Sequence, residues 1–271
     1  MIGLPVLLKK APLVGAFFCL AFGLLPAMAS AQECMAPVGL AQFDVARVVD
    51  GDTLRLRDGR SVRLIGINTP ERGRQGRSDE PFAVQAQRRL QKLVDASDGR
   101  VGLQLGAQGK DRHQRTLAHA YTRDGQNIEA RLLAEGLGWQ VVVAPDNTLA
   151  HCQRQAEQSA RQQRLGVWRE SPVQAASAVS ASGFAIVRGH VTQVEHNGGG
   201  TWIELDRALV LQVPAAARRY FSDRWLAGLS GREVEARGWV VDRARHGAAK
   251  AGQLRWMLRL TDPMMLQDAR R

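Results

Sequence analysis

Alternation of apolar and polar residues predicts short β-strands in the first half of the chain, separated by tight turns. Asp50-Gly51 and Asp58-Gly59 are strong turn signals between apolar runs that are rich in β-branched residues. Strands joined by such short turns pair as a meander. The predicted strands are residues 43–49, 53–56, 61–67, 101–105 and 116–121.

Helical spacing replaces this alternation in three further segments. Apolar residues recur at intervals of three and four over residues 82–94, which predicts an amphipathic helix. Asn127 is the predicted N-cap of a helix that runs through residue 135, and Thr148 is the predicted N-cap of a helix that reaches residue 164. The first half of the chain is therefore expected to contain five strands and three helices.

A linker and a second set of strands follow. Residues 170–182 are small and polar and have no apolar stripe, so they predict a linker between a first unit, residues 43–169, and a second unit, residues 183–271. In the second unit, strands and a helical stretch near residues 216–226 predict a small antiparallel barrel. The fold class is therefore mainly β with α-helices. The predicted strands of the second unit are residues 186–194, 202–205, 209–213, 232–243 and 254–263.

Residues 1–31 have the character of a secretory signal. Lys9 and Lys10 precede an apolar run at residues 11–25, and a pattern of small residues then provides a cleavage site. The run is shorter than the roughly 20 apolar residues that a membrane-spanning helix needs. We therefore expect export to a periplasm or to the medium, no stable membrane anchoring after cleavage, and a short N-terminal arm at residues 32–42.

The charge balance is strongly basic. The chain has 37 Lys and Arg residues against 26 Asp and Glu residues, a net charge of +11, and loss of a leader that contains Lys9 and Lys10 leaves a net charge of +9. Such a balance favours a polyanionic partner such as nucleic acid, but it also serves solubility. Outside the leader only Lys92, Lys110 and Lys250 are lysines. The other basic residues are arginines, whose planar fork suits bidentate phosphate contacts.

Two cysteines, Cys34 and Cys152, remain once Cys19 leaves with the leader. In an oxidising compartment such a pair favours one disulfide, here between the N-terminal arm and a helix. The alternative is that Cys152 is an ordinary buried residue on a helix face. The sequence leaves both possibilities open.

A group of polar residues follows the first predicted turn. The tetrapeptide "DGDT", which contains Asp50 and Asp52, is explained by a hairpin turn when it is taken alone. Arg63 and the motif "NTPE", which begins at Asn68 and ends at Glu71, change this interpretation. A strand that carries Arg63 and ends at Asn68 can put a guanidinium group and a carboxylate beside the turn that presents Asp52.

Four motifs in this order resemble the staphylococcal nuclease (thermonuclease) family: "VVDGDTLRL", "VRLIGINTPE", "DRHQRTLAHAY" and "LGVW". The resemblance covers residues 43–168. It implies a five-stranded barrel of the OB type with three helices. It also implies calcium-dependent hydrolysis of phosphodiester bonds in DNA, RNA or both.

The resemblance assigns a calcium site to three residues. Asp52 would be a carboxylate ligand, Asn68 would stand where the family has a second aspartate ligand, and Thr69 would offer its backbone carbonyl. Asp50 would lie just outside this ligand set. Because Asn68 keeps a carbonyl oxygen but removes one negative charge, we expect weaker calcium binding than in a site with two aspartates.

The resemblance also assigns the catalytic residues. Glu71 would orient or deprotonate the attacking water, and Arg63 and Arg115 would bind the scissile phosphate from two sides. These residue types suit the chemistry, because negative charge builds up on the phosphate oxygens during attack by water. Residues 141–143 are valines where family members carry tyrosines, so contacts to the nucleotide are expected to differ.

The second unit resembles OB-fold nucleic-acid-binding domains in pattern only. Its arginine and tryptophan residues fit contacts with single strands, and they fit a core with a charged surface equally well. The competing hypothesis for the whole chain is a non-catalytic nucleic-acid-binding protein with a weakened metal site. No protein partner can be inferred from the sequence.

Overall fold

The computed structural model describes residues 34–73, 76–246 and 253–269. The predicted signal at residues 1–31 and the start of the N-terminal arm lie outside these ranges. The described residues after position 31 belong to one compact unit. Within the described ranges, no helix is both long and apolar enough to cross a membrane.

The first half of the described chain forms a closed barrel of five strands. These are β1 (Gln42–Val48), β2 (Thr53–Leu56), β3 (Ser61–Leu64), β5 (Arg100–Lys110) and β6 (Thr116–Tyr121). Their order around the barrel is β1-β2-β3-β6-β5, and all pairs are antiparallel except β3–β6, which is parallel. Apolar side chains such as Leu54, Val62 and Ala118 are fully buried in its core.

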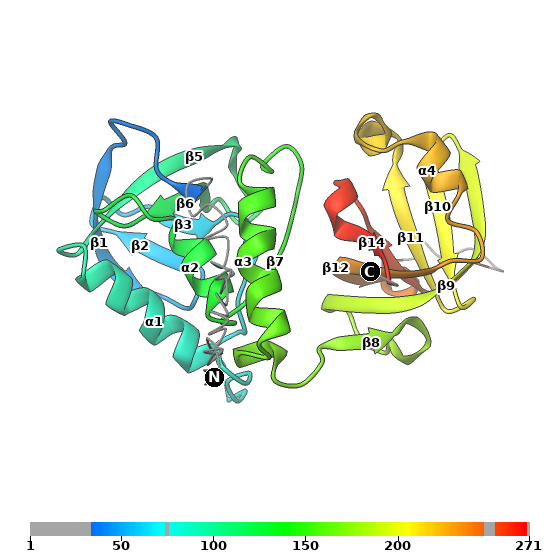
Figure 1. Cartoon of the computed structure of the whole chain (residues 1–271), viewed down its shortest axis with the longest axis horizontal. Helices are drawn as coiled ribbons and strands as arrows, with labels where there is room; N and C mark the ends of the chain where they lie inside the picture. The colour runs from blue at the N-terminus through cyan, green and yellow to red at the C-terminus, as the bar shows by residue number, and fades with distance from the viewer. Residues whose placement is uncertain (1–33, 74–75, 247–252, 270–271) are drawn as a thin grey trace, which may run out of the picture. The chain divides into compact units, whose positions relative to one another are not determined.

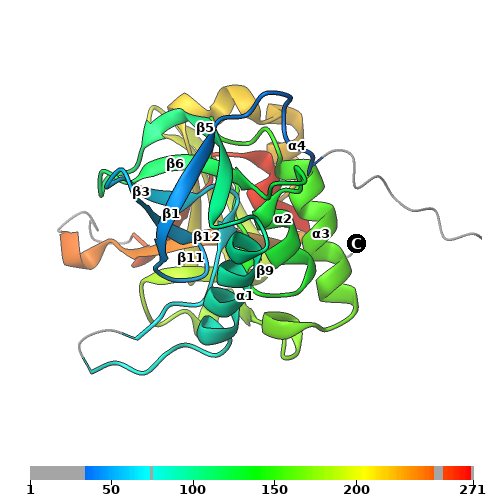
Figure 2. The same cartoon turned by 90° about the vertical axis from the view of Figure 1, so that its left-hand side faces the viewer.

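Three helices lie together on one side of this barrel (Figure 2). They are α1 (Ala83–Asp95), α2 (Ile128–Ala134) and α3 (Ala150–Gln162). The Asn127 cap of α2 is confirmed, because the Asn127 side-chain oxygen accepts a hydrogen bond from the Ala130 N–H at 2.9 Å. The prediction that Thr148 caps α3 is wrong. This helix has no side-chain cap, since the backbone carbonyl of Asn147 accepts the hydrogen bond from the Ala150 N–H instead.

The strand predicted over residues 61–67 is interrupted at Gly66. This residue has a φ of 86°, and a Cβ atom there would lie 2.0 Å from Oε1 of Gln153, so the close approach of α3 requires glycine. The chain then forms a small separate sheet from two strands, β4 (Ile67–Asn68) and β7 (Trp139–Gln140). Their antiparallel pairing sets Asn68 opposite Trp139.

The second half of the described chain forms another five-stranded closed ring. Its strands are β9 (Gly183–Asn197), β10 (Gly200–Leu205), β11 (Leu209–Pro214), β12 (Glu233–Asp242) and β13 (Trp256–Arg259). Their order is β9-β10-β11-β13-β12, and β12 pairs back onto β9. Numbered within each barrel, both barrels therefore have the order 1-2-3-5-4, with a parallel pair between the third and fifth strands. The predicted fold class, two OB-type barrels with helices, is confirmed, although the second barrel is not wholly antiparallel.

Four further elements complete the second barrel. The helical stretch predicted near residues 216–226 is a 3-10 helix followed by a short α-helix. The stretch predicted as a linker contains a strand that pairs parallel with β9, and Ala176 and Val179 within it are buried in the second core. These elements are η4 (Ala215–Tyr220), α4 (Asp223–Ala227), β8 (Val173–Ala175) and, on the far edge of β12, β14 (Leu266–Asp268).

Helix α3 lies between the two barrels (Figure 1). Charged side chains of α3 and β12, most of them buried, contact one another there. Arg161 donates two hydrogen bonds to Glu235 of β12, at 2.7 and 2.8 Å. Arg237 of β12 forms an ion pair with Glu157 of α3 at 2.6 Å, and both side chains are at most 3% exposed. Burial raises the pKa of Glu235, but hydrogen bonds and charges from Arg161, Arg237 and Arg188 outweigh it, so the net pKa is lowered. Glu235 therefore stays ionised inside the contact.

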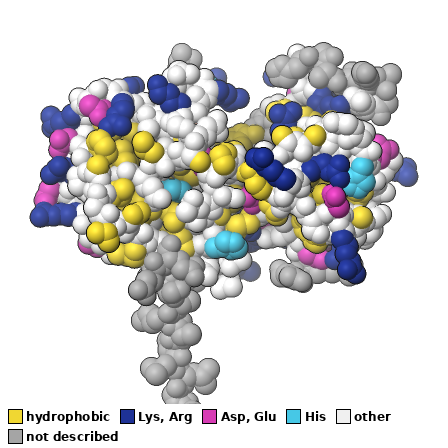
Figure 3. Space-filling model, turned by 90° about the horizontal axis from the view of Figure 1, so that it is seen from above, with side chains coloured by type: hydrophobic (Ala, Val, Ile, Leu, Met, Phe, Trp, Pro, Cys, Tyr) yellow, Lys and Arg dark blue, Asp and Glu magenta, His cyan; other side chains and the backbone are white. Residues whose placement is uncertain are grey.

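On the face shown in Figure 3, the positive charge is not gathered in one patch. Figure 3 shows Lys and Arg side chains in several groups over the face in view, with Asp and Glu side chains between them. The net charge alone therefore does not locate a binding site.

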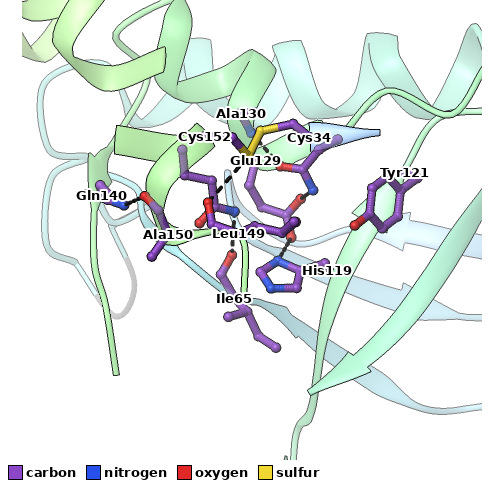
Figure 4. The surroundings of a disulfide bond; sticks show 12 residues. Cys34, Ile65, His119, Tyr121, Glu129, Ala130, Gln140, Leu149, Ala150 and Cys152 are labelled. Carbon is purple, nitrogen blue, oxygen red and sulfur yellow. Dashed lines mark hydrogen bonds and ion pairs between the residues drawn. A yellow bond between two sulfur atoms is a disulfide. The ribbon is translucent and has the colours of Figure 1, made fainter. Parts of the chain in front are cut away.

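A disulfide joins the N-terminal arm to α3 (Figure 4). The Cα atoms of Cys34 and Cys152 lie 5.8 Å apart, and the bond spans 118 positions of sequence. An isolated β-bridge between Met35 and Gln126 also pairs the arm with the first half of the chain. The disulfide therefore holds the arm against the first barrel.

Candidate active site

The turn between β1 and β2 presents two buried acids. Asp50 is 6% exposed and Asp52 is 5% exposed. Between them, a Cβ atom on Gly51 would lie 2.7 Å from the Cβ of Ala86 and from Oγ1 of Thr69. The absence of a side chain at Gly51 therefore lets the turn pack against α1 and against the segment that follows β4.

Asp52 is held by hydrogen bonds and by one ion pair. Its Oδ2 atom accepts hydrogen bonds from the Thr69 N–H at 2.9 Å and from the Thr69 hydroxyl at 3.1 Å. The same oxygen forms an ion pair with Nη1 of Arg63 at 2.6 Å, and Oδ1 accepts a hydrogen bond from the Thr53 hydroxyl at 3.1 Å. These contacts tie the turn to β3 and to the end of β4.

Arg63 lies between two of the predicted ligands. Its side chain is 12% exposed, and while Nη1 contacts Asp52, Nη2 donates a hydrogen bond to Oδ1 of Asn68 at 3.2 Å. The structure therefore brings Asp52, Arg63, Asn68 and Thr69 together, although they come from the turn before β2, from β3, and from β4 with the residue after it.

Asp50 adds a second acid to this group. Its Oδ1 accepts a hydrogen bond from the Asp52 N–H at 3.2 Å. Burial, and next the negative charge of Asp52, raise the pKa of Asp50 to about 6. The part of this shift that comes from Asp52 reflects two carboxyl groups held close together, an arrangement that a cation would stabilise.

Arg115 comes from the loop between β5 and β6 and is oriented by Asp111. The Asp111 carboxylate accepts hydrogen bonds from the Arg115 N–H at 2.9 Å and from its Nε at 2.7 Å. Burial raises the pKa of Asp111, but the hydrogen bonds from Arg115 outweigh it and the net pKa is lowered. The carboxylate therefore remains charged and fixes the direction of the guanidinium group.

A cavity of about 420 Å³ lies beside this loop, and Asp50 and Arg115 both line it. Sequence reasoning missed three further arginines in its wall, Arg47, Arg55 and Arg72. The register of the first hairpin was the available signal for two of them, because Arg47 pairs directly with Arg55 across β1 and β2. Four guanidinium groups around one small cavity suit an anionic ligand.

Glu71 lies on a different cavity. It is exposed, its backbone N–H donates a hydrogen bond to Oε2 of Glu80 at 2.8 Å, and it lines a larger cavity of about 1070 Å³ together with Asn68. Asn68 thus links Glu71 with the Asp52–Arg63 pair. The structure therefore places Glu71 and Arg115 in the walls of two different cavities and does not bring them into one.

The segment between β4 and α1 borders both cavities. Arg72 and Gly73 line the smaller cavity, and Glu71 and Glu80 line the larger one. Asp79 holds this segment, because its Oδ1 accepts hydrogen bonds from Nε of Arg72 at 2.9 Å and from the Gly73 N–H at 2.7 Å. A movement of this segment would therefore change both cavities together.

The donor set fits a hard cation. Among the described residues, no group of three or more His, Cys, Asp and Glu side chains is arranged to hold a metal ion. The predicted set instead combines the Asp52 carboxylate with the Asn68 side-chain carbonyl and the Thr69 backbone carbonyl, and the Asp50 carboxylate lies beside Asp52. Oxygen donors of this kind suit calcium or magnesium rather than zinc.

Comparisons with known proteins agree on the first barrel. A family model described as "Staphylococcal nuclease homologue" matches residues 61–170. The chain is 32% identical over 127 residues to a thermonuclease of Staphylococcus intermedius, a match that covers 46% of this chain and 74% of that protein. It is 30% identical over 136 residues to endonuclease YncB of Bacillus subtilis (strain 168), which covers 49% of this chain and 64% of that protein. A thermonuclease of Staphylococcus hyicus is 28% identical over 129 residues, which covers 46% of this chain and 75% of that protein.

The matched segment contains most of the predicted site residues but begins after Asp50 and Asp52. Residues 61–170 include Arg63, Asn68, Glu71 and Arg115, and they form the last three strands of the first barrel and all three of its helices. A relative 32% identical and covered over 74% of its length is similar across a whole domain rather than at a few motifs. The chain belongs to the staphylococcal nuclease homologue family.

Proposed function

We propose that this protein is an exported, calcium-dependent nuclease that hydrolyses phosphodiester bonds in DNA, RNA or both. The observation that carries the proposal is the position of Arg63, which contacts both Asp52 and Asn68. Asp50, whose side chain accepts a hydrogen bond from the Asp52 N–H, lines the cavity with the four arginines. The names of the relatives, thermonuclease and endonuclease, support the same reaction.

Asp52, Asn68 and the Thr69 carbonyl are the residues that would hold calcium. Bound there, the ion would supply positive charge that stabilises the phosphate oxygens as the diester is attacked. The adjacent Asp50 would strengthen the negative potential of the site. Because Asn68 is neutral, the affinity for calcium is expected to be modest.

Three side chains would act on the substrate. Arg63 and Arg115 would donate hydrogen bonds to the phosphate, where guanidinium forks match two oxygens at once. Asp111 holds Arg115 ready for this contact. Glu71 would orient the attacking water and accept its proton. Loss of either arginine is expected to lower the rate by about 10²–10³-fold.

A nuclease assay on the mature chain tests the proposal. Wild type and Glu71→Gln would be incubated with single-stranded DNA, double-stranded DNA and RNA, each with calcium and with a chelator. We expect cleavage by wild type with calcium, no cleavage with chelator, and a loss of about 10²–10⁴-fold in Glu71→Gln. Equal cleavage by the two proteins would contradict the role of Glu71, and calcium-independent cleavage would contradict the role of the metal.

The neutral Asn68 favours one competing function, a nucleic-acid-binding protein without catalysis. In that case neither protein would cleave any of the substrates, and both would bind nucleic acid with an affinity that falls steeply as salt rises. The same assay, combined with a binding measurement, therefore separates the two functions.

A further inference from the structure

The larger cavity is built by both barrels and shares two residues with the candidate active site. Asn68 and Glu71 lie in its wall, as do Phe184 of β9 and Trp239 of β12. Its volume of about 1070 Å³ is slightly larger than the roughly 300–1,000 Å³ of sites that hold one small ligand. It therefore has room for more than one nucleotide.

A row of aromatic rings crosses this cavity from one barrel to the other. Trp139 pairs with Asn68 across β4 and β7, so both side chains lie on the same face of that small sheet. The Trp139 ring lies 5.6 Å from the Phe184 ring, with an angle of 30° between their planes. Phe184 pairs with Trp239 across β9 and β12, and their ring centroids lie 5.7 Å apart. The row thus begins opposite a predicted metal ligand and ends at Trp239, which is 41% exposed.

The charges in the cavity wall do not favour a purely electrostatic ligand. Arg77 and Arg169 stand there against Glu71, Glu80 and Glu170. A site that bound the phosphate backbone alone would be expected to have an excess of positive charge. Accessible aromatic rings beside a few charged groups suit the flat faces of nucleobases, which stack on aromatic side chains regardless of sequence.

We propose that the groove formed by Trp139, Phe184 and Trp239 binds the bases of unpaired nucleotides next to the scissile phosphate. The second barrel thereby completes a site for single-stranded substrate. Bases inside a duplex are stacked on each other and do not offer their faces, so a double strand would gain little from this groove. The inference rests on the proposed function for the identity of the ligand.

Binding of nucleic acid in the presence of a chelator tests the groove, because this measurement does not depend on cleavage. The full chain would be titrated into a fluorescent single-stranded DNA oligonucleotide and into the matching duplex, and anisotropy would be recorded. Trp239→Ala is expected to weaken single-strand binding by about 5- to 100-fold and to change duplex binding little. Because the lost contact is stacking, this ratio should be nearly the same at low and high salt.

Three further variants control for folding and for nonspecific loss of surface. Trp239→Leu keeps an apolar side chain without a ring and should bind as weakly as Trp239→Ala, whereas Trp239→Phe should recover most of the affinity. Tyr220→Ala removes another exposed aromatic residue of the second barrel, outside the groove, and should bind like wild type. Wild-type affinity in both Trp239→Leu and Trp239→Ala, or an equal loss in Tyr220→Ala, would overturn the inference.

Cleavage assays then separate this inference from the proposed function. With calcium, Trp239→Leu should raise KM for single-stranded oligonucleotides and leave the hydrolysis of bis(p-nitrophenyl) phosphate unchanged, because that small diester does not reach the groove. Ring-dependent binding without any hydrolysis would support the groove and reject the nuclease. Hydrolysis by wild type with no effect of Trp239→Leu on either substrate would support the nuclease and reject the groove.

Discussion

At the scale of single residues, the neutral side chain of Asn68 is the feature that most affects the proposed metal site. Its Oδ1 atom faces Arg63 at 3.2 Å, next to the Asp52 carboxylate. An amide oxygen still offers a ligand, but it supplies no negative charge to offset the charge of a cation. Affinity for calcium rises with the charge of the ligand set.

The variant Asn68→Asp is therefore expected to bind calcium more tightly. The calcium concentration that gives half-maximal nuclease activity should fall by about tenfold, because a second carboxylate would face the ion. Asn197→Asp adds the same charge on a hairpin of the second barrel and should leave this concentration unchanged. An unchanged value in Asn68→Asp would argue against Asn68 as a calcium ligand.

The sequence predicted some residues of the candidate site and missed others. Asp52, Arg63 and Asn68 were found because short motifs with fixed spacing carry them, and the structure does bring them into contact. The aromatic row was not found. Trp139 and Phe184 lie on separate sheets and are far apart in the sequence, so only tertiary packing places the two rings together.

At the scale of elements, most local signals succeeded, although the Thr148 cap did not, and features that depend on distant contacts were missed. The bounds of β2 and β6 agree with the prediction, and the Asn127 cap acts over three residues. In contrast, the break at Gly66 depends on Gln153 of a distant helix, and β8 exists only because β9 offers it an edge. Neither of these partners leaves a local pattern in the sequence.

The turn between β1 and β2 yields a prediction at this scale. Gly51→Ala would put a Cβ atom 2.7 Å from Ala86 and Thr69, so the turn must move away from α1. We expect a loss of about 1–3 kcal/mol in the free energy of unfolding, measured by urea denaturation, and a lower nuclease rate because Asp52 moves with the turn.

Gly109→Ala is the matched control, because a Cβ atom there meets no atom within 4 Å. It should leave both stability and rate close to wild type. Wild-type stability in Gly51→Ala would show that the turn adapts without cost and does not need glycine.

At the scale of the whole molecule, the charge network between α3 and β12 holds the two barrels in contact. Glu235 accepts hydrogen bonds from Arg161, Arg188 and Gln267, and its side chain is 1% exposed. A buried carboxylate surrounded by arginines is costly to leave unpaired, because its charge has lost its hydration. The groove needs this contact, since Phe184 and Trp239 lie on the second barrel and Trp139 on the small β4–β7 sheet of the first half of the chain.

Acid is therefore expected to weaken this contact. The pKa of Glu235 is lowered from its ordinary value of 4.5, so between the folded and unfolded values only the unfolded chain takes up the proton. The stabilisation from Glu235 is thus complete above about pH 5 and is lost as the pH falls through the lowered pKa. Glu235→Gln should lower the free energy of unfolding by about 3 kcal/mol at pH 7, and the difference from wild type should shrink between pH 5 and pH 3.

Glu195→Gln, an exposed control on β9, should follow wild type throughout. A difference that stays constant over this range would show that Glu235 is not the group that titrates. If the network also maintains the groove, the preference for single strands should decline over the same interval of pH.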